Sequence, residues 1–491
     1  MDYKKHPGKE IKKYGEYQKK NPVISIITPF YNTGKEIEET YHSIMNQTYP
    51  YFEWIIVDDG STNEESVKLL DELSKRDDRI KKFTIKNGGP SIARDYGIKN
   101  TSNTKYIFFL DSDDMIDKTA LECFYWTLET HKEASFTYST TVNFGTREFI
   151  WENYFSLERE KEENLITIAS MVKKEDLLEV GCFGIKEKAM YEDWNLWLKL
   201  LKAGKKPIRV SAPLFWYRQS ENGEFQRANK NQEAAMKYIN ETAADIPDNI
   251  LEAIQFPRVE KNTQIDLDKM ILPSYEKEKD VLLFFLTEKN SIEEIKELSK
   301  KYHVITFSTS PLDYTLRQGY EEYSDVYDLS SFLDRVDYLA FTDYIVSSIK
   351  VSQVIINDNT YGTYMISYLS HKYKELNLKN DNKELEELIY ELSIEKDNEA
   401  YRKIVEKYYK DKFDIDINKK EKNPRRSRHL KYFLKRIHAE KDFYFLKTFY
   451  ENFINLLKSI IDFLYSLLLA IPAFIVFLFK CIKRILSKPF R

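Results

Sequence analysis

Two clusters of carboxylates each follow an apolar run in the first quarter of the chain. Asp58 and Asp59 end the run "WIIVDD", and Asp111, Asp113 and Asp114 end the run "YIFFLDSDD". Magnesium and manganese prefer such oxygen ligands, and they neutralise a diphosphate group as it leaves. The second cluster therefore predicts a divalent cation, magnesium or manganese, held on a nucleotide diphosphate, while Asp59 could accept a hydrogen bond from a nucleobase or ribose or simply form an Asp-Gly turn. A solvated acidic turn is the alternative interpretation.

Two further segments add charged groups to this chemistry. Arg94 lies in "GGPSIARDYGI", in the first turn of a predicted helix, where anionic oxygen atoms bind readily. A surface salt bridge is the alternative for Arg94. Glu192 and Asp193 open "EDWNLWLKLL", where one of them would act as a general base already ionised at neutral pH. Acidic residues at a helix start also complement the helix dipole, so the spacing leaves both interpretations open.

Alternating strands and helices are expected to position these groups. Apolar runs predict strands over 23–28, 54–57, 80–85 and 106–110, and helical spacing predicts helices over 35–47, 64–75 and 91–99. Such alternation favours a mostly parallel sheet, in which ligands bind at the carboxyl ends of the strands. Both acidic clusters are therefore expected at the same edge of one sheet.

The rest of the chain predicts further units. A boundary near 245–275 precedes a second α/β unit that starts at "DVLLFFLTE", and residues 376–410 are expected to be helical, highly charged and solvated. The predicted organisation is an N-terminal extension (1–21), a first α/β domain (22–245), a linker (246–278), a Rossmann-like domain (279–375), a charged helical region with a basic linker (376–442) and a tail of membrane-associated helices (443–491).

Composition argues against other classes of protein. The 491 residues carry a formal net charge of -4, which gives no general attraction to nucleic acid, and no nucleic-acid partner is expected. The cysteines Cys123, Cys182 and Cys481 lack metal-ligand spacing and are interpreted as reduced thiols in a cytosolic compartment. Residues 1–21 contain no apolar run of the kind found in secretory signals.

The segment from Phe443 onward predicts a membrane contact. Residues 463–479 carry no charge, and as a helix they would span roughly 25 Å, just short of a hydrocarbon core of about 30 Å. Pro472 lies inside this stretch, and cations flank it on both sides. A single span and an interfacial or re-entrant anchor both remain open, with a buried core helix as a third interpretation. The flanking cations predict placement at the cytoplasmic face of the cell membrane.

Five segments in order resemble the family 2 glycosyltransferases of the GT-A fold. They are "VISIITPFYNTG", "IIVDDGSTN", "NGGPSIARDYGI", "YIFFLDSDD" and "YEDWNLWLKLL", within residues 22–220. The resemblance implies a GT-A sheet flanked by helices, and the transfer of a sugar with inversion from a nucleotide diphosphate sugar to an acceptor hydroxyl, with a divalent metal. Together with the predicted membrane tail, it suggests a glycan or lipid-linked acceptor in the synthesis of cell-surface glycans or glycolipids.

The resemblance also implies roles for single residues in donor binding. The residues it assigns to the nucleotide sugar are Pro29, Tyr31, Asp59, Arg94 and Asp111. Within this set, Tyr31 resembles the aromatic residue that packs on the base, Asp59 the contact to the base or uridine, and Asp111 the contact to the ribose.

Metal binding and catalysis are assigned in the same way. Asp113, together with Asp111, resembles the metal-binding part of a DxD motif, and Asp193 resembles the catalytic base with Glu192 as its neighbour. Asp114 receives no role beyond shaping the turn. Many relatives carry a His after "WYR" that helps hold the metal or diphosphate, but here Gln219 and Ser220 follow. The "QxxRW" signature of processive synthases is also missing, which favours the addition of one or a few sugars.

Residues 279–370 resemble, more distantly, the N-terminal half of a GT-B glycosyltransferase. The glycine-rich loop expected after the first strand is replaced by "TEKNSIEEI", and no donor-binding second half follows. This unit is therefore interpreted as noncatalytic. It would contact acceptor or partner, or it would be a plain structural domain.

Other functions account for fewer of these motifs. A phosphatase of the haloacid dehalogenase type needs Thr or Val two residues after its second Asp, whereas Asp114 is followed by Met115 and Ile116. A nucleotidyltransferase needs a glycine-rich phosphate loop, which "TPFYNTG" does not provide. A catalytically inactive membrane-bound scaffold or nucleotide-sugar-binding protein remains an alternative, and the joint presence of all the acidic motifs argues against it.

Overall fold

A computed structural model describes most of the first 413 residues of the chain. The described residues are 1–9, 16–17, 19–184, 191–220, 232–244, 246, 270–271, 275–276, 278–287, 289–357, 359–380, 382–394 and 398–413. They belong to a compact unit, Met1–Lys412, except for the last one, which opens a second unit, Phe413–Arg491. The predicted basic linker and membrane-associated tail lie outside the described residues. Among the helices that the structure describes, none is long and apolar enough to cross a membrane.

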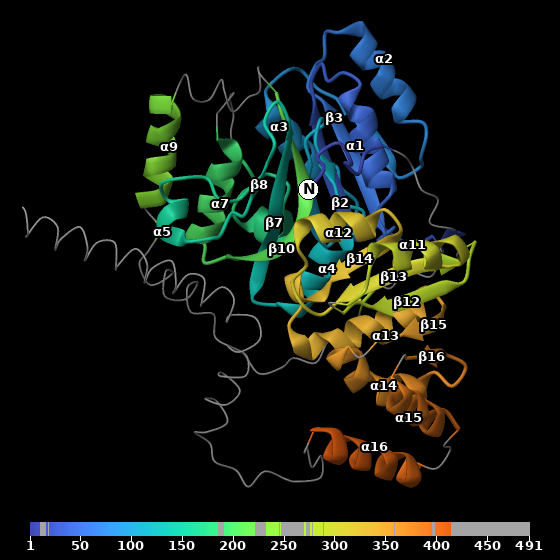
Figure 1. The fold of residues 1–491 in the computed structure, drawn as a ribbon. Coiled ribbons are helices and arrows are strands. Elements are labelled where there is room, and N and C mark those ends of the chain that lie inside the picture. Colours follow the sequence, from blue (N-terminus) through green and yellow to red (C-terminus); the bar gives the residue numbers. More distant parts are fainter. Residues whose placement is uncertain are drawn as a thin grey trace, which may run out of the picture. The chain divides into compact units, whose positions relative to one another are not determined.

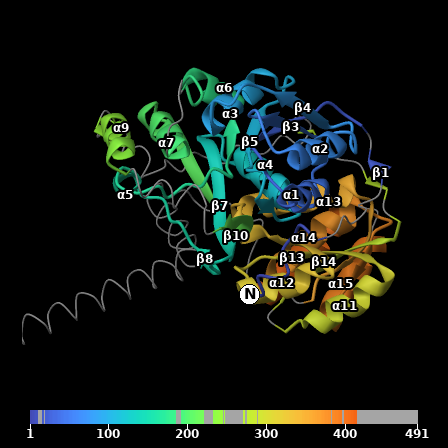
Figure 2. The ribbon, with the colours of Figure 1, turned by 90° about the horizontal axis from the view of Figure 1, so that it is seen from above.

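The first sheet of the compact unit contains strands from residues 24 to 219. They are β2 (Ile24–Phe30), β3 (Phe52–Asp58), β4 (Ile80–Thr84), β5 (Tyr106–Phe109), β6 (Met115–Ile116), β7 (Ala134–Gly145), β8 (Phe149–Trp151), β9 (Met171–Lys173) and β10 (Lys206–Gln219). Their order is β4-β3-β2-β5-β9-β7-β10-β6, with β8 paired to β7. Figures 1 and 2 show this sheet from two sides.

The predicted α/β class is confirmed, but the sheet is mixed rather than mostly parallel. Strands β2, β3, β4 and β5 pair in parallel, as do β7 and β10. By contrast, β9 is antiparallel to both β5 and β7, β8 is antiparallel to β7, and β6 is antiparallel to β10. Strand β8 follows β7 through a short turn, as antiparallel pairing allows, whereas β6 and β9 pair with strands from distant parts of the chain.

Helices cover both faces of this sheet. They are α1 (Glu36–Met45), α2 (Glu64–Leu73), α3 (Pro90–Lys99), α4 (Ala120–Thr130), α5 (Leu157–Glu160), α6 (Lys174–Glu179), α7 (Glu192–Lys202) and α9 (Gln232–Ala244). Successive side chains of a strand point to opposite faces, so Ile26 packs with α1, α2 and α4, whereas Ile27 packs with α3, α6 and α7. Figures 1 and 2 both show α9 beside α7.

Helix α3 lies very close to the sheet. A Cβ atom at Gly97 would come within 2.7 Å of Ile27 Cγ2, a separation that real Cβ atoms essentially never show. The helix starts after Gly89, whose φ of 98° is accessible mainly to glycine. Glycines therefore fix both the start of α3 and its height above the sheet.

The second sheet of the compact unit has the strand order of a Rossmann-like fold. It contains β12 (Val281–Phe285), β13 (His303–Ser308), β14 (Ser324–Asp328), β15 (Val351–Ile355) and β16 (Asn377–Lys379), in the order β14-β13-β12-β15-β16, all parallel. Its helices are α11 (Ile292–Lys301), α12 (Tyr314–Glu321), α13 (Tyr338–Ser348), α14 (Thr360–Lys372) and α15 (Lys383–Ile394), with short 3-10 turns η3 (Leu329–Ser331) and η4 (Arg335–Asp337), and α16 (Asn398–Phe413) follows.

The expectation of a solvated helical region over 376–410 was wrong at its start. Residues 377–379 form β16, which pairs with β15, and the side chains of Leu385, Leu388, Ile389 and Leu392 from α15 are buried in the core. The apolar face of α15 packs beside this sheet, so only its other face is solvated. The predicted N-terminal extension and linker also meet, because β1 (Glu16–Tyr17) pairs antiparallel with β11 (Tyr275–Glu276).

Candidate active site

The ends of β2, β3 and β5 bring their loops together at one edge of the first sheet. Ser112, within the acidic turn after β5, lies 2.6 Å from Thr33 in the loop after β2, hydroxyl to hydroxyl. The side chain of Asn32 accepts hydrogen bonds from the backbone N–H groups of Thr62 and Asn63, which follow β3. The two acidic clusters therefore lie at the same edge of the sheet, on either side of β2.

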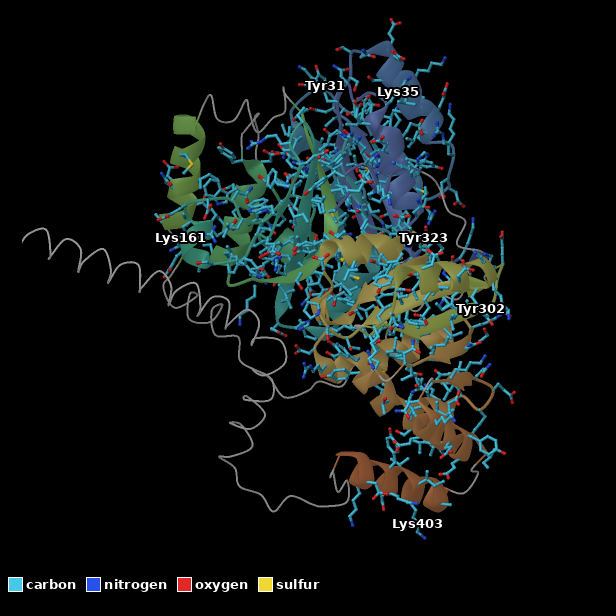
Figure 3. All side chains as sticks on the ribbon, in the orientation of Figure 1. Tyr31, Lys35, Lys161, Tyr302, Tyr323 and Lys403 are labelled. Carbon is cyan, nitrogen blue, oxygen red and sulfur yellow. The ribbon has the colours of Figure 1, made fainter. Side chains whose placement is uncertain are left out.

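Pro29 lies within β2, and Tyr31 follows the end of that strand. Tyr31 is 50% exposed. Figure 3 shows Tyr31 at the edge of the sheet together with Lys35. An exposed ring at a strand end can stack on a planar base, so the predicted contact of Tyr31 remains a prediction compatible with its position.

Asp59 holds the loop that precedes α3. Its two carboxylate oxygens accept hydrogen bonds from the backbone N–H groups of Gly88 and Gly89, each at 2.7 Å, and the side chain is buried. Carboxylate oxygens can accept more than one hydrogen bond, so the predicted contact between Asp59 and a nucleobase stays open as a prediction. The structure adds a second role, because Asp59 fixes where α3 begins.

Arg94 joins two motifs that are far apart in the sequence. Its Nη2 lies 2.6 Å from Asp111 Oδ1, and its Nη1 lies 2.7 Å from Glu192 Oε1. The guanidinium is buried, with 3% of the side chain exposed, and the neighbouring charges of Asp111 and Glu192 raise its pKa despite burial. Arg94 is the fifth residue of α3, beyond the first turn where the sequence placed it. Its guanidinium therefore forms ion pairs with Asp111 and Glu192, and its predicted contact with the nucleotide sugar stays a prediction.

The three carboxylates after β5 differ in environment. Burial and the charge of Asp111 raise the pKa of Asp113 to about 6. Asp114 is fully buried, and burial raises its pKa well above the usual range, with the charges of Asp113 and Asp111 adding to the effect. Its Oδ1 accepts a hydrogen bond of 2.8 Å from the backbone N–H of Arg218. Asp114, which was predicted only to shape the turn, therefore joins the acidic turn to β10.

Arg218 is a residue of this site that the sequence did not single out. Its Nε donates a hydrogen bond of 2.8 Å to the backbone carbonyl of Asp113, and its Nη2 forms an ion pair with Glu39. The next residue, Gln219, donates its side-chain amide to Asn143 and so bonds β7. The only available signal was the cation in "WYR", at the position just before the histidine of many relatives.

Asp193 lies at the start of α7, after a residue with unusual backbone geometry. Tyr191 has a φ of 56°, which is strained for a residue other than glycine. Asp193 Oδ2 accepts a hydrogen bond of 3.0 Å from Asn164, and Oδ1 accepts one of 2.8 Å from the Trp194 backbone. Burial and the charge of Glu192 raise the pKa of Asp193 to about 7. Asp193 therefore holds its proton to a higher pH than a solvated carboxyl group does, and its ionisation at neutral pH stays a prediction.

Two more residues near the carboxylates escaped the sequence-based prediction. Asn164 comes from an irregular segment 28 residues before Glu192, and nothing in its local sequence indicates a contact with Asp193. Tyr217 lies among the acidic groups. Burial raises the pKa of its phenol, and the charges of Asp114 and Asp111 raise it further. A neutral phenol beside several carboxylates can donate a hydrogen bond to a ligand or to one of them.

A sheet edge with an acidic turn and an acidic helix start is typical of glycosyltransferases, and comparison with known proteins agrees. The glycosyl transferase family 2 model matches residues 25–192. The putative teichuronic acid biosynthesis glycosyltransferase TuaG of Bacillus subtilis is 32% identical over 208 residues, which are 41% of this chain and 81% of that protein. The chain therefore belongs to glycosyl transferase family 2.

Other relatives match a shorter part of the chain. An uncharacterized glycosyltransferase of Rickettsia conorii is 43% identical over 118 residues, which are 24% of this chain and 18% of that protein. The match thus spans less than a fifth of that relative. Among solved structures, the crystal structure of S. aureus TarS 1-349 in complex with UDP-GlcNAc is similar, with a TM-score of 0.41 and 20% identity over 47% of this chain and 71% of that chain.

Proposed function

We propose that this protein is an inverting glycosyltransferase that uses a nucleotide diphosphate sugar and a divalent cation. The observation that carries the proposal is the position of Arg94, whose guanidinium bonds Asp111 at 2.6 Å and Glu192 at 2.7 Å. A single side chain thereby links the acidic turn after β5 to the acidic start of α7. The carboxylates proposed to bind the donor therefore lie close to the start of α7, which carries the proposed base.

Asp113 and Asp111 have the chemistry that a divalent cation requires. Both offer carboxylate oxygens, and the raised pKa of Asp113, about 6, reflects burial beside another negative charge that a cation would offset. Among the described residues, no group of three His, Cys, Asp or Glu side chains is arranged to hold a metal. Magnesium commonly takes one or two carboxylates and fills its coordination with water and phosphate oxygens. A bound cation would neutralise charge on the departing diphosphate.

Asp193 is the proposed general base. The acceptor hydroxyl would give its proton to Asp193, its oxygen would bond to the anomeric carbon, and the bond from that carbon to the diphosphate oxygen would break. A single displacement of this kind inverts the configuration at the anomeric carbon. Asn164 and the Trp194 backbone orient the carboxylate, and a pKa of about 7 suits a base that works near neutral pH.

The acceptor and cellular location are part of the same proposal. A glycan or lipid-linked acceptor at the cytoplasmic face of the cell membrane agrees with the cation-flanked apolar stretch at 463–479. Synthesis of a cell-envelope polysaccharide is supported by the relative TuaG, a putative teichuronic acid biosynthesis glycosyltransferase. The direct contacts of Pro29, Tyr31 and Asp59 with the nucleotide belong to the proposal as well.

A panel of nucleotide sugars tests the donor. UDP, GDP and dTDP sugars are added to the purified protein with and without manganese, and the melting temperature is measured. At least one donor is expected to raise it only with metal present, because binding to the folded state alone stabilises that state. A catalytically inactive donor-binding scaffold would show this shift without any release of nucleotide diphosphate or transfer of sugar. No shift with any donor would contradict donor binding itself.

A further inference from the structure

The second sheet packs against the first domain through helix α4, and the two share one apolar core. The rings of Trp126 on α4 and Phe341 on α13 lie edge to face with centroids 4.9 Å apart. Residues of both sheets belong to the same buried cluster, including Phe108 from β5 and Phe285 from β12. Two packed elements that share a continuous core are expected to hold a fixed relative orientation.

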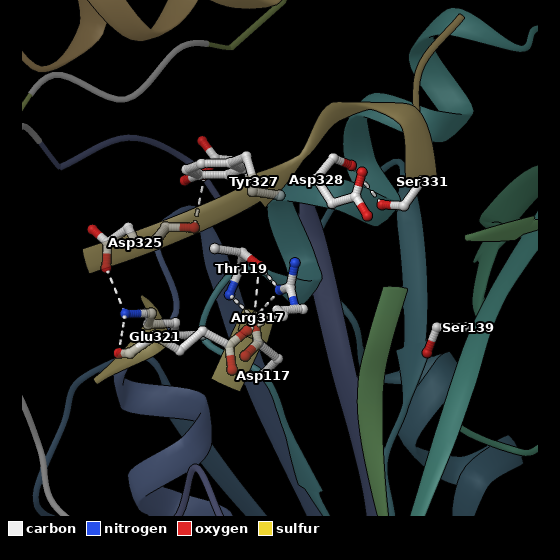
Figure 4. A network of polar contacts seen from close by, with 12 residues as sticks. Asp117, Thr119, Ser139, Arg317, Glu321, Asp325, Tyr327, Asp328 and Ser331 are labelled. Atoms are coloured by element: carbon white, nitrogen blue, oxygen red, sulfur yellow. Dashed lines mark hydrogen bonds and ion pairs between the residues drawn. The ribbon is translucent and has the colours of Figure 1, made fainter. Parts of the chain in front are cut away.

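Buried charged and polar groups cross this contact beside the apolar core. Figure 4 shows Arg317 of α12 next to Asp117 and Thr119, which immediately precede α4. Arg317 Nη2 lies 3.3 Å from Asp117 Oδ1, and its Nε lies 2.7 Å from Glu321 without hydrogen-bond alignment. The Arg317 side chain is 2% exposed. A buried guanidinium between two carboxylates fixes geometry more narrowly than apolar packing does, because its charge needs partners at set positions.

A second set of polar contacts crosses the same interface at other residues. Glu122 on α4 is fully buried and accepts hydrogen bonds from the hydroxyl groups of Tyr327 and Tyr344, and from Thr48 at 2.7 Å. Lys118 lies 3.0 Å from Asp325. These contacts involve Glu122 of α4 and Lys118, and none of them involves Arg317 or Asp117. A variant that removes one of them can therefore serve as a control for a variant of Arg317.

Asp117 connects this interface to the candidate site. It follows Asp114 by three residues, and the two residues between them form β6, which pairs with Phe215 and Trp216 of β10. The Asp117 N–H donates to the Leu214 carbonyl at 2.8 Å, while its own carbonyl accepts from Gln47 at 2.7 Å. The side chain that Arg317 holds therefore belongs to the same short segment as the acidic turn, and that segment lies along β10.

At the carboxyl ends of the strands of the second sheet, in contrast, polar side chains form hydrogen bonds with nearby backbone groups. Ser291 caps α11, Asp313 caps α12 and Asn359 caps α14, each through a side-chain oxygen that accepts from backbone N–H groups of the helix. Helix amides that are already bonded are less available to a phosphate. The polar contacts described for this unit thus favour a role in supporting the first domain.

We propose that the second α/β unit positions the donor-site carboxylates, with Arg317 as the positioning residue that holds Asp117 and, through β6, the turn carrying Asp113 and Asp114. The proposal deepens the proposed function, on which its enzymatic readout rests, but the geometry of the turn can be measured without any donor. Arg317 is expected to act on the first domain even though it makes no contact with substrate.

Hydrogen–deuterium exchange of the full chain tests the positioning directly. In Arg317→Met, the rate of amide exchange across residues 112–118 is expected to rise by about fivefold to tenfold. Loss of the ion pair between Arg317 and Asp117 should make local opening of this segment easier by that factor. Arg317→Lys keeps the charge and should restore part of the protection. Tyr327→Phe removes one hydroxyl from the same interface and should leave exchange over 112–118 unchanged. Unchanged exchange over 112–118 in Arg317→Met would overturn the proposal.

Donor binding supplies the second readout. If the proposed function holds, Arg317→Met weakens metal-dependent donor binding at a temperature well below its melting point, and Tyr327→Phe does not. Looser exchange with full donor affinity would overturn the link to the site. If no donor binds wild-type protein, the proposed function fails while the exchange result still decides the positioning role. Should Arg317→Met lack a single cooperative melt, Asp117→Asn and Arg317→Lys decide the question with the same measurements.

Discussion

The two sheets of this chain end their parallel strands in different ways. In the first sheet, strand ends lead to Asp111 and Asp113, and within the described residues the Asp113 carboxylate has no side-chain partner. In the second, Asn290 bonds the turn after β12, Asp328 bonds the loop before α12, and Asn359 caps α14. A ligand site can lie at the carboxyl edge of a parallel sheet. Whether such a site is present depends on whether the side chains at the strand ends are available to a ligand or are already bonded to the protein's own backbone.

The largest expected effect concerns the base of the first sheet. Asp193→Asn removes the group proposed to accept the proton but keeps its size and its contact with Asn164. Turnover is expected to fall by about 10²- to 10⁴-fold, with donor affinity unchanged, because a general base acts in the transition state. Steady-state kinetics and donor titration measure the two quantities. Asp78→Asn, at an exposed residue, serves as the control, and an active Asp193→Asn variant would contradict the assignment.

Removing the charge that links the two acidic motifs should have the next largest effect. Arg94→Met leaves Asp111 and Glu192 facing each other without a cation, and breaking a buried ion pair in this way costs about 3–5 kcal/mol of stability. Donor binding should be lost as well. Arg94→Lys keeps the charge but cannot bond both carboxylates through a fork, and an intermediate result is expected from it. Urea unfolding and donor titration test this, and a fully stable Arg94→Met protein would refute the linking role.

The pH dependence of turnover should report the environment of Asp193. Its raised pKa of about 7 means that kcat/KM rises with pH, by about tenfold per unit below that value, and then levels off. Because the folded state holds this proton more tightly than the unfolded chain, Asp193 also lowers stability as pH increases from about 4 to 7. Asp193→Asn should therefore melt above wild type at pH 8 and close to it at pH 4. A rate profile that is flat from pH 5 to 8 would contradict this assignment.

The smallest effect is expected at the carboxyl edge of the second sheet. Asn359→Ala removes the cap of α14 and should cost about 1 kcal/mol of stability without changing turnover. The same titrations should give one donor bound per chain in wild type and in this variant. Binding at a second site that Asn359→Ala abolishes would show that the two edges are more alike than their contacts indicate.

The sequence predicted well those features that depend on neighbouring residues. The apolar runs before Asp58 and Asp111 are buried strands, and their acidic ends lie at one edge, because strand identity and direction follow from local pattern and crossovers. Motif order was also sufficient to indicate the family. The positions of Glu192 and Asp193 at the start of α7 match the expectation from helical spacing.

The missed features depend on contacts between distant segments. Arg94 and Glu192 are 98 residues apart, and their side chains meet only because α3 and α7 fold onto the same face of the first sheet. Strands β6, β9 and β16 are two or three residues long, too short to show a periodic pattern. The burial that raises the pKa of Asp193 likewise comes from surrounding elements, so the sequence alone could not indicate the direction of this shift.

Gly97 limits how the donor site can be redesigned. Its missing Cβ lets α3 lie against Ile27, and the height of α3 determines where the guanidinium of Arg94 reaches. Any larger residue at position 97 would lift the helix and shift that guanidinium away from one or both acidic motifs. A library built to accept new sugars should therefore keep position 97 constant, just as it should keep Tyr31, for which a contact with the base is proposed.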